Sequence, residues 1–82
     1  MDIEFDPAKE AINIEKHGIS LARAVDLEVL ALIEDDRFEE ARFRIYGHID
    51  GLPYCAAGTR RGQKVRIINL RRAHRKEMDR YV

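Results

Sequence analysis

The sequence predicts a small α+β domain, with two N-terminal helices, an antiparallel sheet of three to four strands and a short C-terminal helix. A helix-start signal stands at Asp6-Pro7, residues 42–49 alternate between apolar and polar side chains, and the pattern within residues 64–81 changes from strand to basic helix. At 82 residues, the chain has room for one core, so we expect a single domain over residues 1–82.

The first long element is a helix from Pro7 to about His17, after a short strand over residues 3–5. Asp6 is a typical N-cap, proline suits the first helical position, and Gly18 suits the C-cap. The pattern predicts an apolar stripe formed by Ala8, Ala11, Ile12 and Ile14, with Lys9, Asn13, Lys16 and His17 on the polar side.

A second short helix is expected from Leu21 to about Asp26, capped by Ser20, with Leu21, Ala24 and Val25 at helical spacing. The run VLALIE over residues 29–34 favours a strand, although its periodicity also fits an extension of that helix. Residues 35–40 form an acidic loop in this interpretation.

The alternating stretch predicts a half-buried strand from Arg42 to Ile49. One face carries Phe43, Ile45 and Ile49, and the other, an open cationic face, carries Arg42, Arg44, Tyr46 and His48. Asp50-Gly51 is a strong hairpin signal, and it predicts a return strand over residues 52–60.

Arg61-Gly62 then predicts a turn into a last strand that begins at Lys64 and changes period after Leu70. On this strand Val65 and Ile67 share one face, whereas Lys64 and Arg66 share the other. The strand exit and the helix after it gather five cations, which are Arg71, Arg72, Arg75, Lys76 and Arg80. Such an edge suits a phosphate backbone.

The net charge of zero hides an asymmetry along the chain. Residues 1–59 hold 6 Lys/Arg against 13 Asp/Glu, a balance of −7, whereas residues 60–82 hold 9 against 2, a balance of +7. Either the acidic elements fold against the basic ones, or the basic face binds a polyanion such as nucleic acid or an acidic protein.

Composition excludes several classes of protein. The single cysteine, Cys55, excludes an internal disulfide and is expected to be a small buried hydrophobe. No apolar stretch approaches 18 residues and no signal peptide precedes the domain, so we expect no membrane association and a cytoplasmic location.

Four segments in register, FDPAKEAINIEKHGIS, GHIDGLPY, TRRG and VRIINLRRAHRKEMDRY, resemble the BrnT family of bacterial type II toxin–antitoxin toxins. The resemblance implies a RelE-like fold and a ribonuclease that stops translation. It also implies neutralisation by a ribbon-helix-helix antitoxin in a hetero-oligomer, with DNA contacted through the antitoxin.

RNA cleavage without a metal requires a base near the ribose 2′-hydroxyl, cations around the phosphorane and an acid for the leaving oxygen. The three histidines have no metal-ligand spacing and the carboxylates form no ligand cluster, so we expect no metal and no other cofactor. The guanidinium groups of Arg66, Arg71 and Arg72 are suited to the scissile phosphate.

His17 is the first candidate for acid–base catalysis, although a histidine at a helix end can also serve the last carbonyls and the helix dipole. Glu77 is either a base or, more simply, a group that orients Arg72 and Arg80. Tyr81 can stack on a base, bind a phosphate or anchor the core.

Four further cations, Lys16, Arg42, Arg44 and Arg60, are candidates for tracking the RNA backbone, although surface cations are commonly only solvated. Three functions remain open from the residues: a toxin ribonuclease, a regulatory module that binds nucleic acid or the antitoxin without cutting, and a subunit whose basic edge binds an acidic protein. We expect His48 and His74 to be surface residues outside the site.

Overall fold

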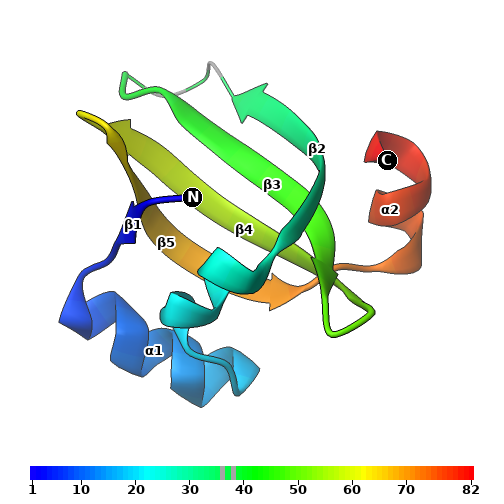
Figure 1. The fold of residues 1–82 in the computed structure, drawn as a ribbon, viewed down its shortest axis with the longest axis horizontal. Helices are drawn as coiled ribbons and strands as arrows, with labels where there is room; N and C mark the ends of the chain where they lie inside the picture. The colour runs from blue at the N-terminus through cyan, green and yellow to red at the C-terminus, as the bar shows by residue number, and fades with distance from the viewer. Residues whose placement is uncertain (36, 38) are drawn as a thin grey trace.

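The structure is a computed structural model that describes residues 1–35, 37 and 39–82. A five-stranded sheet in the order β1-β5-β4-β3-β2 forms its centre, with α1 and α2 at opposite ends of the view in Figure 1. The elements are β1 (Ile3–Glu4), α1 (Pro7–His17), the 3₁₀ helix η1 (Leu21–Asp26), β2 (Glu28–Asp35), β3 (Arg42–Ile49), β4 (Leu52–Arg61), β5 (Lys64–Arg72) and α2 (Arg75–Tyr81).

The expected fold class was wrong in two respects. The sheet is mixed and has five strands, because β1 pairs in parallel with β5 outside the antiparallel β2–β5 meander. There is also one main N-terminal helix, since the second predicted helix is the short 3₁₀ segment η1. A two-residue strand and a six-residue 3₁₀ turn carry too little periodicity to be distinguished in a sequence.

The bounds and caps of α1 are confirmed. Asp6 Oδ1 accepts a hydrogen bond from the backbone N–H of Ala8 at 2.7 Å, and Gly18 adopts φ +70° while its N–H donates to Ile14 at 2.8 Å. Glycine takes this left-handed conformation more easily than any other residue because it has no Cβ, so Gly18 fixes where the helix ends.

The predicted apolar stripe of α1, formed by Ala8, Ala11, Ile12 and Ile14, was wrong, because all four residues are exposed. The buried residue of the helix is Asn13, at 2% exposure. Its amide Nδ2 donates to the carbonyl of Leu70 at 2.8 Å, and its Oδ1 accepts from the Leu70 N–H at 3.0 Å. The helix therefore docks on β5 through the Asn13 side chain, whose amide makes with the Leu70 backbone the two hydrogen bonds that a neighbouring strand would otherwise make.

A second polar contact joins α1 to η1. The Glu10 carboxylate accepts hydrogen bonds from Ser20 Oγ at 2.6 Å and from the Leu21 N–H at 2.7 Å, and Ser20 caps η1 as predicted. Leu21 and Ala24 are fully buried, whereas Val25 is exposed, so only part of the predicted apolar face of η1 is used.

The two sheet faces are defined by neighbouring side chains of β3. Ile45 belongs to the main apolar core beneath α1 and η1, whereas Tyr46 belongs to a smaller cluster beneath α2. We call these surfaces the α1 face and the α2 face. The main core consists of Leu21, Ala24, Leu27, Phe43, Ile45, Ile49, Ala56, Ile67 and Leu70. The buried part of the smaller cluster consists of Tyr46, Cys55 and Ala73.

The expectation of an open polar face on β3 was wrong for Tyr46, which is fully buried beneath α2. Burial of Cys55 is confirmed, and it raises the pKa of that thiol. The predicted loop over residues 35–40 includes residues 36 and 38, which lie outside the described residues; Asp35 itself ends β2.

The hairpin at Asp50-Gly51 is confirmed, with positive φ values of 52° and 79° at these residues, as a type I′ turn requires. β5 runs to Arg72, two residues beyond the expected change at Leu70. An irregularity in its pairing with β4 lets Ile67 and Leu70, three residues apart, both enter the main core. As a result, Arg71 shares the face of Tyr46 and Cys55, and Arg72 takes the face of the main core.

Candidate active site

The candidate site lies on the α2 face, where three strands place polar side chains in one row. Tyr46 on β3 lies opposite Cys55 on β4, which in turn lies opposite Arg71 on β5. Arg44 occupies the next position on this face of β3. Helix α2 completes the site with Glu77 and Tyr81.

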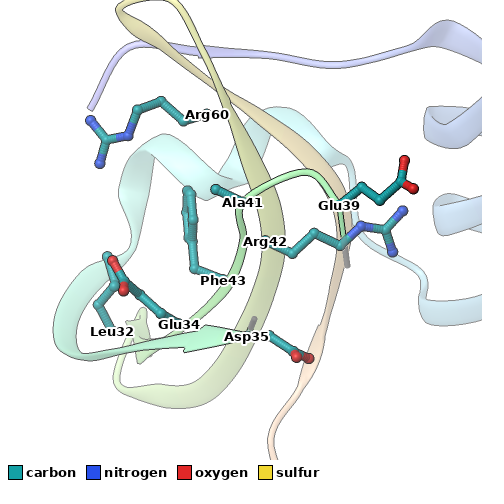
Figure 2. A pocket seen from close by; sticks show the side chains of 8 residues that line it. All are labelled: Leu32, Glu34, Asp35, Glu39, Ala41, Arg42, Phe43 and Arg60. Carbon is teal, nitrogen blue, oxygen red and sulfur yellow. The ribbon is translucent and has the colours of Figure 1, made fainter. Parts of the chain in front are cut away.

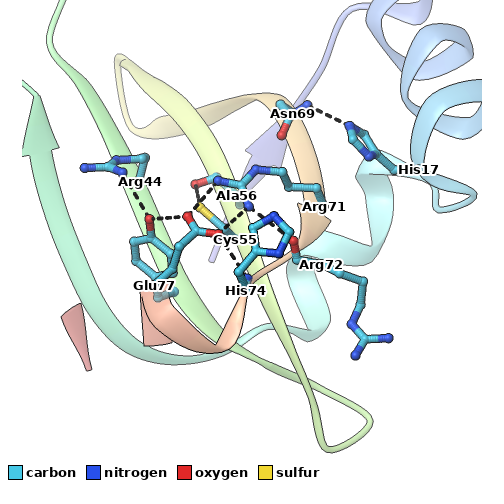
Figure 3. Close-up of polar contacts among 10 residues, drawn as sticks. His17, Arg44, Cys55, Ala56, Asn69, Arg71, Arg72, His74 and Glu77 are labelled. Atoms are coloured by element: carbon cyan, nitrogen blue, oxygen red, sulfur yellow. Dashed lines mark hydrogen bonds and ion pairs between the residues drawn. The ribbon is translucent and has the colours of Figure 1, made fainter. Parts of the chain in front are cut away.

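Glu77 is the centre of the hydrogen-bond network shown in Figure 3. Its carboxylate accepts two bonds from the Arg71 guanidinium, both at 2.8 Å, one from Tyr46 Oη at 3.0 Å and one from the His74 backbone N–H at 3.0 Å. Arg71 is the main reason that the pKa of Glu77 falls to about 2. At neutral pH, Glu77 is therefore an ionised anchor for Arg71 and is poorly suited to donating a proton.

Arg44 lies against a stacked pair of tyrosines. The rings of Tyr46 and Tyr81 stack with centroids 5.1 Å apart, and the Arg44 guanidinium carbon lies 4.9 Å from the Tyr81 centroid. Arg44 Nη1 donates to Tyr46 Oη at 3.1 Å, whereas its buried Nε has no hydrogen-bond partner among the described residues. The guanidinium is thus fixed in direction, and the Arg44 side chain as a whole is only half-buried, so an incoming anion can approach it.

The same arginine changes the acidity of its neighbour. A hydrogen bond with Arg44 is the largest reason that the pKa of Tyr81 falls below its ordinary value. In contrast, burial is the largest reason that the pKa of Tyr46 rises. Tyr81 is therefore the phenol of this pair that gives up its proton more easily.

Further along the α2 face, Arg42, Thr59 and Arg66 lie opposite one another on β3, β4 and β5. Arg66 lies 4.0 Å from a Glu4 carboxylate oxygen and 3.8 Å from an Asp6 oxygen, distances that leave it weakly paired. Between this row and Arg44 is a hollow of about 150 Å³, lined by Asp35, Arg42, Phe43, Arg44, Ala57, Gly58 and Ile68. Arg42 and Arg44 therefore border the same hollow on this side of the sheet.

The other predicted site residues do not join this group. His17 is exposed at the end of α1, where its Nε2 lies 3.4 Å from Asn69 Nδ2, and Figure 3 shows it well apart from Arg44 and Glu77. Arg72 lies over Tyr54, a residue packed against the main core, with its guanidinium carbon 5.6 Å from the ring centroid. Lys16 is exposed on α1, and Arg60 lies opposite Val65, which also packs against the main core.

Two details of the network differ from the sequence expectations. Glu77 binds Arg71, not the expected Arg72 or Arg80. Tyr46 was missed as a site residue, although its hydroxyl contacts both Arg44 and Glu77. Its position in the alternating stretch, two residues from Arg44, was the one signal that could have identified it.

A larger hollow, of about 270 Å³, lies near the chain segment between β2 and β3 (Figure 2). Its lining residues are Leu32, Glu34, Asp35, Glu39, Ala41, Arg42, Phe43 and Arg60. Among the described residues, no group of three His, Cys, Asp or Glu side chains is placed to hold a metal ion. Within the same part of the chain, no helix is long and apolar enough to cross a membrane.

Comparisons with known proteins agree with the resemblance of the motifs. A family model described as "Ribonuclease toxin, BrnT, of type II toxin-antitoxin system" matches residues 5–77. The crystal structure of the Brucella abortus ribonuclease toxin BrnT superposes with a TM-score of 0.70 at 25% sequence identity, covering 92% of this chain and 99% of that one. A search of curated proteins finds no match.

Proposed function

Since this chain belongs to the BrnT family of ribonuclease toxins of type II toxin–antitoxin systems, we propose that it cuts RNA on its α2 face without a metal ion. The observation that supports this most strongly is the fixed group formed by Arg44, Arg71, Glu77 and Tyr81. It joins two cations to a phenol of lowered pKa on one face of the sheet.

The proposed reaction is an internal transesterification. The ribose 2′-oxygen bonds to the adjacent phosphorus as the bond from phosphorus to the 5′-oxygen breaks. A proton passes from the 2′-hydroxyl to the Tyr81 phenolate, and the 5′-oxygen takes a proton from water. The products are a 2′,3′-cyclic phosphate and a 5′-hydroxyl, and Tyr81 returns to the phenolate by releasing its proton to solvent.

Arg44 and Arg71 supply the positive charge that a metal ion would otherwise provide. The phosphorane carries one more negative charge than the starting phosphodiester, so donors fixed beforehand stabilise it more than they stabilise the substrate. Two tyrosines hold Arg44 and the Glu77 carboxylate holds Arg71, and we therefore assign Glu77 a positioning role. Arg42 and Arg66 bind the neighbouring backbone phosphates in this proposal.

The test is cleavage of total RNA and of translating ribosomes by purified protein in the presence of EDTA. Replacing Arg44 by Gln is expected to lower the cleavage rate by about 10²-fold, as for loss of one oxyanion donor. Arg71→Ala is expected to do the same, whereas Arg72→Ala, a change at the neighbouring position on the other face, is expected to remain within about threefold of wild type.

Loss of cleavage in EDTA, restored by a divalent metal, would overturn metal independence. If folded wild type cuts neither free nor ribosome-bound RNA, the chain is a binding module. His17 stays a prediction that the same assay tests. A loss in His17→Ala as large as that in Arg44→Gln would move the proton transfer to the end of α1.

The role proposed for Tyr81 predicts how the RNA cleavage rate depends on pH. Because its pKa lies below the ordinary tyrosine value, the cleavage rate is expected to rise with pH above neutrality and level off earlier than for a free phenol. Tyr81→Phe keeps the ring that Arg44 covers and removes the proton acceptor. The variant should lose this rise, while its RNA affinity stays close to that of wild type.

The antitoxin partner follows from the family, and we further propose that it is a ribbon-helix-helix protein acting with this toxin in the cytoplasm. Support comes from the four sequence motifs in register. Coexpression with the small protein encoded beside the toxin should give a stable hetero-oligomer that restores growth and binds operator DNA through the antitoxin.

A further inference from the structure

Strand β2 is a free edge of the sheet. The strand order ends on β2, so among the described residues no strand pairs with its outward backbone N–H and C=O groups. The strand also exposes three large apolar side chains, with Val29 at 50%, Leu30 at 45% and Leu32 at 50%. An open edge with apolar side chains is the template to which an extended peptide adds as a further strand.

The larger hollow shown in Figure 2 continues this edge. Leu32 belongs both to the exposed apolar row and to the lining of the hollow, and Phe43 also lines it. The hollow holds about 270 Å³, enough for one large apolar side chain. Glu34 and Arg60 also line it and can bind the polar neighbours of such a side chain.

We propose that the outer edge of β2 and this hollow dock an extended, apolar and basic segment of the antitoxin, which adds as a sixth strand and places one apolar side chain in the hollow. The proposal rests on the toxin–antitoxin role given above. It adds which surface the antitoxin uses and what kind of segment it contributes.

Charge indicates the basic character of that segment. Glu28 and Glu34 have no ion-pair partner among the described residues, and Glu39 adds a carboxylate at the hollow. The other acidic groups nearby are already bound, since Asp26 pairs with Arg23 and Asp35 with Arg37. Glu28 lies opposite His48 and Glu34 opposite Phe43, on the two different faces of the sheet, so Lys or Arg side chains on both faces of an added strand would meet these carboxylates.

The same charges disfavour a second copy of this chain as the occupant. If two β2 strands paired antiparallel about their centres, Glu28 of each would lie opposite Asp35 of the other, and Glu34 would lie opposite Val29. Like charges directly opposite each other destabilise a strand pair. The irregularity between Val29 and Ala31 further discourages flat self-pairing.

This docking surface borders the candidate active site at Arg42, which lines both hollows, but it does not include Arg44 or Arg71. Leu32 lies opposite Ile45 of the main core, whereas its neighbour Ile33 lies opposite Arg44 and belongs to the α2-face cluster. Docking at β2 therefore leaves Arg44 and Arg71 uncovered, and inhibition requires another part of the antitoxin to reach the α2 face. Variants of Leu32 and Glu34 are consequently expected to keep RNA cleavage and to lose neutralisation.

The experiment titrates the purified cognate antitoxin into the full-length toxin by calorimetry. Leu32→Glu is expected to raise the dissociation constant about tenfold or more, and Glu34→Lys about fivefold with a weaker salt dependence. Ile12→Glu, a matched aliphatic-to-Glu change, and Glu15→Lys lie at exposed positions of α1 and should stay within about twofold of wild type. Hydrogen exchange should show new protection of residues 28–35 in the wild-type complex.

Circular dichroism checks the fold of each variant, and Leu32→Ser replaces Leu32→Glu if the latter unfolds. Equal affinity for wild type and both β2 variants overturns the proposal, as does a larger loss in the α1 controls. If the wild-type toxin forms a homodimer and Leu32→Glu is a monomer, the β2 edge binds a second copy of the chain. This result also overturns the proposal. RNA cleavage by the same proteins is measured in parallel, so failure of the ribonuclease function is seen separately from failure of the docking surface.

Discussion

The two faces of the sheet are each covered by a helix, yet they are built from different interactions. The α1 face buries a continuous set of aliphatic and aromatic side chains, among them Leu21 and Leu70, both fully buried. On the α2 face, only Tyr46, Cys55 and Ala73 are buried in the cluster, and an ionic network around Glu77 holds the helix.

This difference indicates that the α1 face mainly stabilises the fold, whereas the α2 face holds the groups proposed to act on RNA. Apolar burial on the α1 face is non-directional and proportional to area, so it supplies most of the folding free energy. The polar contacts on the α2 face contribute less net stability, but they fix the directions of charged groups that remain accessible to an anion. A sheet open on one side to charged ligands therefore depends on its other side to fold.

The largest expected effect comes from the α1 face. Leu70→Ala removes a fully buried side chain and should lower the free energy of unfolding by about 2–5 kcal/mol. Urea denaturation measures the loss, and Leu52→Ala, at a 44% exposed position on β4, should cost well under half as much. A similar loss in both variants would contradict the assignment of the main core.

Asn13→Ala tests whether the helix on the α1 face is held by a polar contact. The change leaves the buried N–H and C=O of Leu70 without their side-chain partner, and we expect a loss of about 1–3 kcal/mol. Asn69→Ala removes an amide whose contact with His17, at 3.4 Å, is long and exposed, and it should change stability little. If the two variants unfold at the same urea concentration, Asn13 does not anchor α1.

Glu77→Gln tests the α2 face by pH. The pKa of Glu77 is lowered from 4.5 to about 2, so its stabilisation is complete above pH 4.5 and is lost as the pH falls toward 2. Since the side chain is 20% exposed, we expect the wild type to lose about 1–2 kcal/mol more than Glu77→Gln over that interval. If the free energy of unfolding falls equally in wild type and Glu77→Gln as the pH is lowered, the bidentate contact with Arg71 is contradicted.

The smallest effect is expected from Ile12→Ser. Because this side chain is 51% exposed on α1, the free energy of unfolding should change by no more than about 0.5 kcal/mol. Thermal unfolding is sufficient to measure it. A loss comparable to that of Leu70→Ala would restore the apolar stripe that the sequence predicts and the structure contradicts.

Local signals in the sequence were reliable where the physics is local. Asp6 and Gly18 bound α1, and Asp50-Gly51 makes the hairpin, because capping and turn geometry depend on a few neighbouring residues. The alternation from Arg42 to Ile49 also predicts β3 with correct bounds. The four motifs identify the family, which the family model confirms over residues 5–77.

Helical periodicity alone gave the wrong buried face of α1. Periodicity predicts that the apolar residues Ile12 and Ile14 face the core. The helix instead contacts β5 through Asn13, whose amide hydrogen-bonds the backbone of Leu70. Asn13 and Leu70 are 57 residues apart in the sequence, so a pattern read over neighbouring residues cannot predict the hydrogen bond between them.

By itself, the chain determined its caps, its hairpin, its basic C-terminal segment and its family, since each depends on residue types at short spacing. Tertiary structure alone decided which cations meet. Arg71 and Arg72 are equivalent in the sequence, yet the pleat and the irregular pairing of β5 turn Arg71 toward Glu77 and Arg72 toward Tyr54. Strand register and helix docking set that choice, because only they determine which face of the sheet each side chain occupies.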